Sequence, residues 1–258
     1  TPKGLDQIHF TTGGSTAIDT AVRMVHYYQA SRGCASKKLI IARDHSYHGS
    51  TYAAMSAGKR PGDHVPEFQY MNDIFHHISC PNPYRPPEGM EEGDLTELLV
   101  KEFEDTIERL GSNNIGGFLA EPIQASGGVI IPPDSYLRRI REVCKTHNIL
   151  FVADEVVTAF GRLGHWFASE DEFGMIPDII CSAKGLSSGY LPIGAMIYSS
   201  EVHEVISQSE SGYFTSGFTY AGHPVSCAAA LKNIEIMERE DILKNAHDVG
   251  LYFENKLS

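Results

Sequence analysis

The chain has 258 residues and a formal net charge of -12, from 21 Lys and Arg against 33 Asp and Glu, so it would repel a phosphate backbone and we expect no nucleic-acid partner. Its five cysteines are scattered without a Cys-x-x-Cys pair, which favours reduced thiols in a cytoplasmic protein over a disulfide framework or a zinc site. The longest apolar runs are strand-sized, far below the roughly 20 residues that cross a bilayer, so we expect no membrane association.

Strand-like and helical patterns alternate along the chain. Strands are predicted at residues 7–11, 37–43, 115–120, 149–153, 178–183 and 193–199. Apolar helix faces are formed by Ile18, Ala21, Val22, Val25 and Tyr28, by Leu99, Phe103, Ile107 and Leu110, and by Leu137, Ile140 and Cys144. Several strands are apolar throughout, as is typical of strands buried on both faces. The pattern predicts an α/β fold with a mostly parallel central sheet and helices on both faces.

Residues 45 to 93 interrupt this alternation. They are rich in Pro and Gly and too long for an ordinary connection, so we predict an ordered loop near a site. His76 and His77, within this segment, are predicted to be surface residues. No pair of histidines has metal-ligand spacing with a carboxylate.

Ionisable residues follow several of the predicted strands. "DHSYHG" follows residue 43, Glu121 follows residue 120, Asp154 follows residue 153 and Lys184 follows residue 183. In open α/β sheets ligands bind in the crevice beyond the carboxyl ends of the strands. We therefore expect these residues to meet at one site.

A phosphate site is suggested by "HFTTGGSTAIDTAV", in which a strand runs into Gly13 and Gly14 before Ser15 and Thr16 open a helix. Alone the signal is weak, because a Gly-Gly turn and a Ser or Thr cap begin many helices. The segment matches neither the Walker loop nor the dinucleotide fingerprint.

Asp154 and Glu155 are adjacent, so on an extended chain they point to opposite faces and only one readily enters a given pocket. Asp154 could instead cap a helix or form an ion pair. Lys184, if partly desolvated in the crevice, could attack a carbonyl and form a Schiff base. A phosphate cradle, a carboxylate and such a lysine together predict pyridoxal phosphate as the cofactor.

The sequence resembles the class III aminotransferases, pyridoxal-phosphate enzymes of fold type I, and among them the omega-amino-acid:pyruvate branch. The motifs are "TTGGSTAIDTAVR", "DHSYHGST", "FLAEPIQASGGVIIPP", "LFVADEVVTAFGRLG", "CSAKGLSSGYLPIGA" and "SGFTYAGHPVSCAAAL", which span about residues 8 to 237. The resemblance implies the large domain of such an enzyme at residues 1–240. Residues 241–258 would begin the connection to a C-terminal small domain absent from this chain.

The resemblance also implies a role for each matching residue. Lys184 would bond to the cofactor aldehyde and shuttle a proton, and Asp154 would hold the pyridine nitrogen protonated. Tyr47 and Val156 would press on the two faces of the ring. The remaining assignments concern the cofactor phosphate and the pocket: Gly14 and Ser15 would bind the phosphate, Thr219 would reach the phosphate of the neighbouring subunit of a homodimer, and Glu121 would support the carboxylate side of the pocket. Tyr47 could instead fill a core, and Thr219 could cap a helix.

The implied activity is ping-pong transfer of an amino group from an omega-amino acid or amine to pyruvate or a similar 2-oxo acid. A lyase or mutase of the same fold, or a truncated, non-catalytic cofactor-binding fragment, are alternatives. The family usually has Ser-Gly-Ser-Glu where this chain has Gly13 to Thr16, which leaves the phosphate geometry open. Ser126 stands where relatives acting on ornithine or gamma-aminobutyrate commonly carry a gating glutamate, which argues against those donors.

Overall fold

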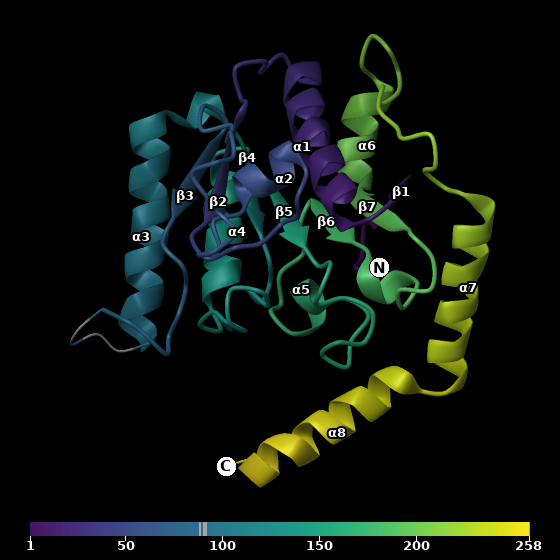
Figure 1. The fold of residues 1–258 in the computed structure, drawn as a ribbon. Helices are drawn as coiled ribbons and strands as arrows, with labels where there is room; N and C mark the ends of the chain where they lie inside the picture. The colour runs from purple at the N-terminus through teal and green to yellow at the C-terminus, as the bar shows by residue number, and fades with distance from the viewer. Residues whose placement is uncertain (88, 90–91, 258) are drawn as a thin grey trace.

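The computed structural model of the chain describes residues 1–87, 89 and 92–257. Within them one sheet has the strand order β1-β7-β6-β5-β4-β2-β3 (Figure 1). The strands are β1 Leu5–Thr11, β2 Leu39–Arg43, β3 Phe75–Ile78, β4 Ile115–Ala120, β5 Leu150–Asp154, β6 Ile179–Ser182 and β7 Gly194–Ser199. Strand β7 is antiparallel to both of its neighbours, and the other pairs are parallel. The predicted, mostly parallel sheet is confirmed, and each of the six predicted strands is present.

Helices cover both faces of the sheet, as predicted (Figure 1). They are α1 Gly14–Ser31, α2 Tyr52–Ala57, α3 Glu92–Leu110, α4 Tyr136–Thr146, α5 Ala168–Asp171, α6 Ser200–Ser207, α7 Pro224–Arg239 and α8 Ile242–Leu257, with short 3-10 turns at Ser112–Asn114 and Lys184–Leu186. Helices α1 and α6 pack on one face, and α3 and α4 pack on the other. None of the helices in the described residues combines the length and the apolar character that a bilayer crossing requires.

The two-sided core follows from strands that are apolar at every position. Successive strand side chains point to opposite faces, so Ile40 packs with the α1 cluster while Ile41 packs with the α3 and α4 cluster. In β4, Leu119 likewise packs with the α1 cluster and Phe118 with the α3 and α4 cluster. Fully burying one such side chain contributes about 1.5–3 kcal/mol. The sheet is therefore held from both sides, which fixes the edge where its parallel strands end.

The segment from residue 45 to 93 contains two elements that the loop prediction missed. Helix α2 packs against α1, and β3 pairs in parallel with β2 at the edge of the sheet. The prediction of surface positions for His76 and His77 is wrong, because both lie in β3 and are partly buried. The four-residue strand "FHHI" has two polar residues and carries little strand signal on its own.

We expect His77 to make the stability of the fold depend on pH. Burial lowers its pKa from 6.5 to about 4, and its Nε2 lies 3.0 Å from the carbonyl oxygen of Ala57. Because the unfolded chain binds the proton more readily, this contribution is fully present above pH 6.5 and declines as the pH falls toward 4. A shift of this size corresponds to about 3 kcal/mol.

Urea unfolding of the parent and of His77→Gln between pH 7 and pH 4 measures this effect. The free energy of unfolding should fall less steeply with acid in the variant. Burial also lowers the pKa values of His9, His26 and His76, so the difference between the two proteins is the relevant quantity. Parallel curves would show that His77 titrates normally.

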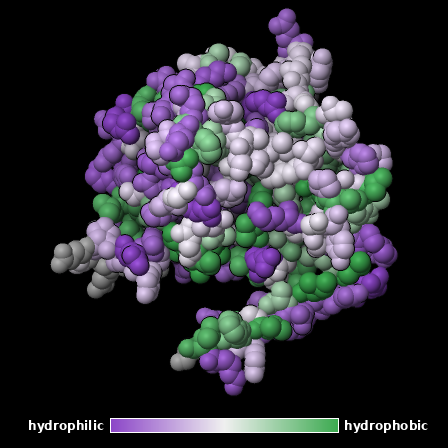
Figure 2. All heavy atoms as spheres, viewed as in Figure 1, coloured by the Kyte–Doolittle hydropathy of each residue, from purple (hydrophilic) through white to green (hydrophobic). Residues whose placement is uncertain are grey.

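Helix α8, Ile242–Leu257, lies at the end of the described chain and contacts α7. None of its described residues is buried, and apolar side chains are visible along it at the bottom of the molecule (Figure 2). The division into a large domain at residues 1–240 and a connecting segment at 241–258 stays a prediction.

Candidate active site

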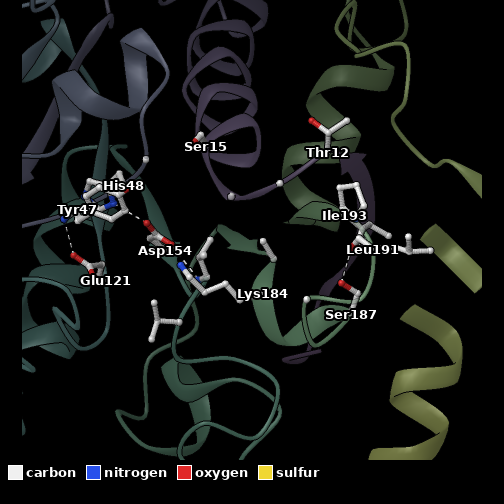
Figure 3. Close-up of a pocket in the computed structure, with 18 of the residues that line it drawn as sticks. Thr12, Ser15, Tyr47, His48, Glu121, Asp154, Lys184, Ser187, Leu191 and Ile193 are labelled. Atoms are coloured by element: carbon white, nitrogen blue, oxygen red, sulfur yellow. Dashed lines mark hydrogen bonds and ion pairs between the residues drawn. The ribbon is translucent and has the colours of Figure 1, made fainter. Parts of the chain in front are cut away.

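A cavity of about 470 Å³ lies at the carboxyl ends of the parallel strands (Figure 3). Seven of the eight predicted site residues line it: Gly14, Ser15, Tyr47, Glu121, Asp154, Val156 and Lys184. The eighth, Thr219, lies outside the cavity lining and is exposed. The site thus brings together residues from segments spread over most of the chain.

The topology of the sheet explains why these residues lie together. The ends of β1, β4, β5 and β6 lie at one edge, so the residues that follow each strand are neighbours in space. Because β7 runs antiparallel, its start lies at the same edge. Ser187 and residues 189–193, which lead into β7, form a further wall of the cavity.

The first turn of α1 forms the anion-binding side of the cavity. Gly14 and Ser15 begin this 18-residue helix, and no acidic residue lies in its first turn. Ser15 Oγ accepts a hydrogen bond from the Ser50 backbone N–H at 3.1 Å. The approach requires glycine at Gly49, where a Cβ would lie 2.3 Å from Ser15 Oγ and φ is 134°. Free N–H groups at a helix N-terminus suit a phosphate.

Thr16, one of the departures from the family pattern, turns its hydroxyl into the loop. Its Oγ1 donates to the Gly13 carbonyl oxygen at 2.9 Å and lies 3.3 Å from the Thr12 hydroxyl. The substitution therefore stabilises the turn before the helix.

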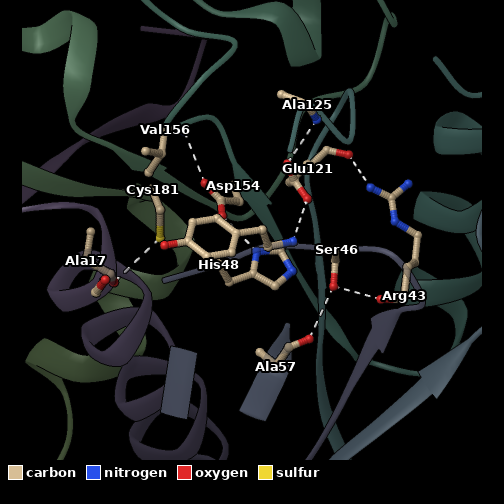
Figure 4. A network of polar contacts seen from close by, with 12 residues as sticks. Ala17, Arg43, Ser46, His48, Ala57, Glu121, Ala125, Asp154, Val156 and Cys181 are labelled. Atoms are coloured by element: carbon tan, nitrogen blue, oxygen red, sulfur yellow. Dashed lines mark hydrogen bonds and ion pairs between the residues drawn. The ribbon is translucent and has the colours of Figure 1, made fainter. Parts of the chain in front are cut away.

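Asp154 ends β5 and its carboxylate faces the cavity, with 4% of the residue exposed (Figure 4). Its Oδ2 lies 2.7 Å from Nδ1 of His48, and its Oδ1 accepts the Val156 backbone N–H at 3.1 Å. Of the two alternatives, pairing is present and capping is not. Pairing with His48 coexists with a place in the cavity, so Asp154 is available to a ligand.

Glu155 points away from the cavity, as its position next to Asp154 predicts. Its carboxylate accepts hydrogen bonds from the backbone N–H groups of Ala168 at 2.7 Å and Ser169 at 2.9 Å, and from the Thr158 hydroxyl at 3.1 Å. Burial raises the pKa of Glu155, and these hydrogen bonds oppose that rise. Glu155 therefore anchors α5 and leaves Asp154 as the carboxylate for the ligand.

Lys184 lies two residues beyond β6, and its side chain is directed toward Asp154 in Figure 3. Its amino group forms no hydrogen bond or ion pair with the residues that the structure describes. Lys184 is exposed and lines the cavity. An unpaired amine facing a carboxylate-lined cavity can still act as a nucleophile or a base.

Glu121 joins the two loops on the other side of the cavity. Its Oε1 accepts the Tyr47 backbone N–H at 3.1 Å, and its Oε2 accepts the Ala125 backbone N–H at 3.2 Å. Burial raises the pKa of Glu121, while the nearby His48 lowers it. Beside it, the buried Arg43 donates to the Glu121 carbonyl oxygen (Figure 4). Glu121 thus holds the loop that carries Tyr47.

Sequence reasoning missed His48 as a site residue. Its side chain is fully buried, lines the cavity and contacts Asp154, and its Nε2 has no hydrogen-bond partner among the described residues. The available signal was its position inside "DHSYHGST", directly after Tyr47. The loop at 187–193 was also missed, although it belongs to the quoted segment that contains Lys184.

The residues present fit pyridoxal phosphate. The α1 N-terminus is free for a phosphate, Asp154 offers a carboxylate oxygen to a protonated ring nitrogen, and Lys184 offers an unpaired amine to an aldehyde. No group of three or more His, Cys, Asp or Glu side chains in the described chain is arranged to hold a metal ion.

Comparison with known proteins identifies the family. The whole chain, residues 1–258, matches the family described as Aminotransferase class-III. The putrescine–pyruvate aminotransferase of Pseudomonas aeruginosa is 42% identical over 244 residues, covering 94% of this chain and 52% of that protein. Gamma aminobutyrate transaminase 1, mitochondrial, of Solanum lycopersicum is 42% identical over 260 residues, covering all of this chain and 50% of that protein. The chain belongs to the class III aminotransferases and spans about half the length of the curated relatives it matches.

Solved structures agree. An (S)-enantioselective omega-transaminase from Thermomicrobium roseum superposes with a TM-score of 0.92 at 39% identity, over 97% of this chain and 55% of that chain. An amine transaminase from an uncultivated Pseudomonas species, in its pyridoxal-phosphate-bound form, gives a TM-score of 0.92 at 37% identity, over 96% and 56%. The predicted family, fold and cofactor are confirmed. The argument from Ser126 stays a prediction, since relatives named for putrescine and for gamma-aminobutyrate are equally similar.

Proposed function

We propose that the complete protein transfers an amino group from an omega-amino acid or amine to pyruvate or a similar 2-oxo acid in a ping-pong reaction. The proposal depends on the meeting of the unpaired Lys184 amine, the Asp154 carboxylate and the first turn of α1 in one cavity. Pyruvate as acceptor is supported by the similarity to a putrescine–pyruvate aminotransferase.

Each residue would have a distinct task. When bound, pyridoxal phosphate supplies an aldehyde that bonds to amines and a ring that accepts electrons. Gly14 and Ser15 would hold the phosphate, and Asp154 would keep a proton on the ring nitrogen. Lys184 Nζ would take a proton from the substrate carbon and return it, as a positioned general base. Tyr47 and Val156, which both line the cavity, would confine the ring.

Incubating the complete, cofactor-loaded protein with pyruvate and one amino donor at a time tests the proposal. Putrescine, gamma-aminobutyrate and beta-alanine are suitable donors, and alanine is the product to measure. We expect alanine to form in equal amount to the donor consumed with at least one of them. Donor breakdown or rearrangement without alanine, with 2-oxoglutarate also inactive as acceptor, would instead indicate a lyase or mutase. Cofactor binding without any turnover would indicate a non-catalytic protein.

We also propose that the complete protein is a homodimer in which Thr219 completes the neighbouring site. Thr219 is exposed and lies outside its own chain's cavity, which supports the proposal. The apolar side chains of Tyr213, Tyr220 and Val225, on either side of it, are also exposed. Two-fold symmetry would create both composite sites at once.

Mixing a complete Lys184→Ala protein with a complete Thr219→Ala protein should restore activity after subunit exchange. If Thr219 acts across the interface, one site of each mixed dimer carries both changes and the other carries neither. Random exchange of equal amounts would restore about a quarter of the parental sites. The test requires that each variant alone is impaired. Confirmed exchange without recovery, or a fully active monomer, would show that Thr219 serves its own chain.

A cytoplasmic location is likewise a proposal. All five cysteines are free in the structure, which suits a reducing compartment. Cell fractionation with an antibody against the protein tests it.

A further inference from the structure

We propose that Arg60 is a positioning residue that holds the ring of Tyr47 against the active-site cavity. The inference rests on the proposed function, because it takes Tyr47 as the side chain that confines the cofactor ring. Arg60 itself does not line that cavity.

The position of Tyr47 makes such a support necessary. Tyr47 and Gly49 line both the active-site cavity and a second cavity of about 630 Å³. Tyr47 therefore lies between two cavities. Its hydroxyl lies 3.3 Å from the Ser50 hydroxyl, only three residues away, so this contact does not tie the ring to another segment.

Arg60 lies outside the segment from Tyr47 to Ser50 and contacts the Tyr47 ring. Its guanidinium carbon lies 5.0 Å from the centroid of the Tyr47 ring, within the range of a cation–π interaction. Its Nη1 donates to the carbonyl oxygen of Ser126 at 3.4 Å, and its Nη2 pairs with Asp63. One guanidinium thus connects the Tyr47 ring to the turn after β4.

The chemistry of arginine suits this position. A planar guanidinium can lie over an aromatic ring while its N–H groups donate to other partners, and an ammonium group cannot match that geometry. Glu121 holds the backbone of the same loop through the Tyr47 N–H but leaves the side-chain torsions free. Arg60 and Glu121 therefore have complementary tasks: Arg60 holds the ring of Tyr47, and Glu121 holds its backbone.

Pyridoxal phosphate affinity of the complete protein, measured by equilibrium dialysis, tests the inference without relying on turnover. Losing the cation–π contact in Arg60→Gln should raise the Kd about five-fold. Arg60→Lys, which keeps the charge but loses the plane, should also weaken binding. Lys59→Gln is the matched control, because Lys59 is the adjacent cation and pairs with Asp44 at 2.9 Å instead of contacting the ring. It should leave the Kd unchanged.

A double-mutant cycle shows whether Arg60 acts through Tyr47. Tyr47→Leu alone should weaken binding about ten-fold, and adding Arg60→Gln should change little more. If Arg60→Gln has no effect, or the same effect with and without the Tyr47 ring, the inference is wrong while the proposed function stands. If the parent does not bind the cofactor, or Tyr47→Leu binds as tightly as the parent, the proposed role of the site is wrong. Thermal unfolding of each apo variant confirms that the proteins compared are folded.

Discussion

Replacing Lys184 with alanine in the complete protein is expected to lower the turnover number for amino transfer by about 10³-fold or more. A positioned general base contributes roughly 10²–10⁴-fold, and the variant also loses the amine that would bond to the cofactor. The amino group of Lys184 lines the cavity and has no hydrogen-bond or ion-pair partner among the described residues, so its removal breaks no such contact there. Apo stability should be nearly parental.

Two further measurements give this prediction its specificity. Lys184→Arg keeps a positive charge but offers no deprotonated amine, and it should be as inactive as the alanine variant. Borohydride reduction of the cofactor-loaded parent, followed by peptide mapping, should place the label on Lys184. A label on another lysine would mean that Lys184 is not the residue that bonds to the cofactor. An active arginine variant would mean that Lys184 contributes only its charge.

Asp154→Asn is expected to keep the fold and lower the turnover number about 100-fold. Asparagine has nearly the same shape and can still accept the Val156 N–H through its side-chain oxygen. An amide does not stabilise a protonated ring nitrogen as a carboxylate does, and losing a charge-assisted hydrogen bond costs about 1.5–3 kcal/mol. Steady-state kinetics with a saturating donor, together with urea unfolding, separate turnover from stability.

Asp178→Asn provides the matched control for Asp154. Asp178 is also a buried carboxylate, but it directly precedes β6 and pairs with Arg141 at 2.6 Å. It also accepts the Phe151 backbone N–H at 2.7 Å. Its replacement should lower the free energy of unfolding while the folded enzyme turns over normally. If Asp154→Asn instead behaves like Asp178→Asn, the role of Asp154 is structural.

The sequence was sufficient to predict most of the sheet and much of the site. Strands such as β4 and β5 are short apolar runs, and the residues that end or follow them had to meet once the strands were parallel. Asp154 and Lys184 could therefore be placed at one edge of the sheet from the sequence alone. Strand β3 was missed because its extended conformation depends on pairing with β2. Its own four residues carry little strand signal.

Buried polar residues were the harder part of the site to predict. His48 and Asp154 are 106 positions apart in the sequence. No local sequence pattern predicts that the His48 side chain is fully buried and contacts that carboxylate. The same holds for Arg60, whose contacts with Tyr47 and with Ser126 depend on how two loops fold over each other. Periodicity describes which face of an element is buried, but not which loops meet across a site.

The neighbouring carboxylates of Asp154 and Glu155 restrict which insertions and deletions the gene can tolerate. Side chains alternate between the faces of a strand, so adding or removing one residue within β5 would exchange the two positions. The glutamate would then enter the cavity and the aspartate would face α5, so the ligand contact and the anchor of Ala168 and Ser169 would fail together. Length changes should therefore be absent from β5 in working homologues.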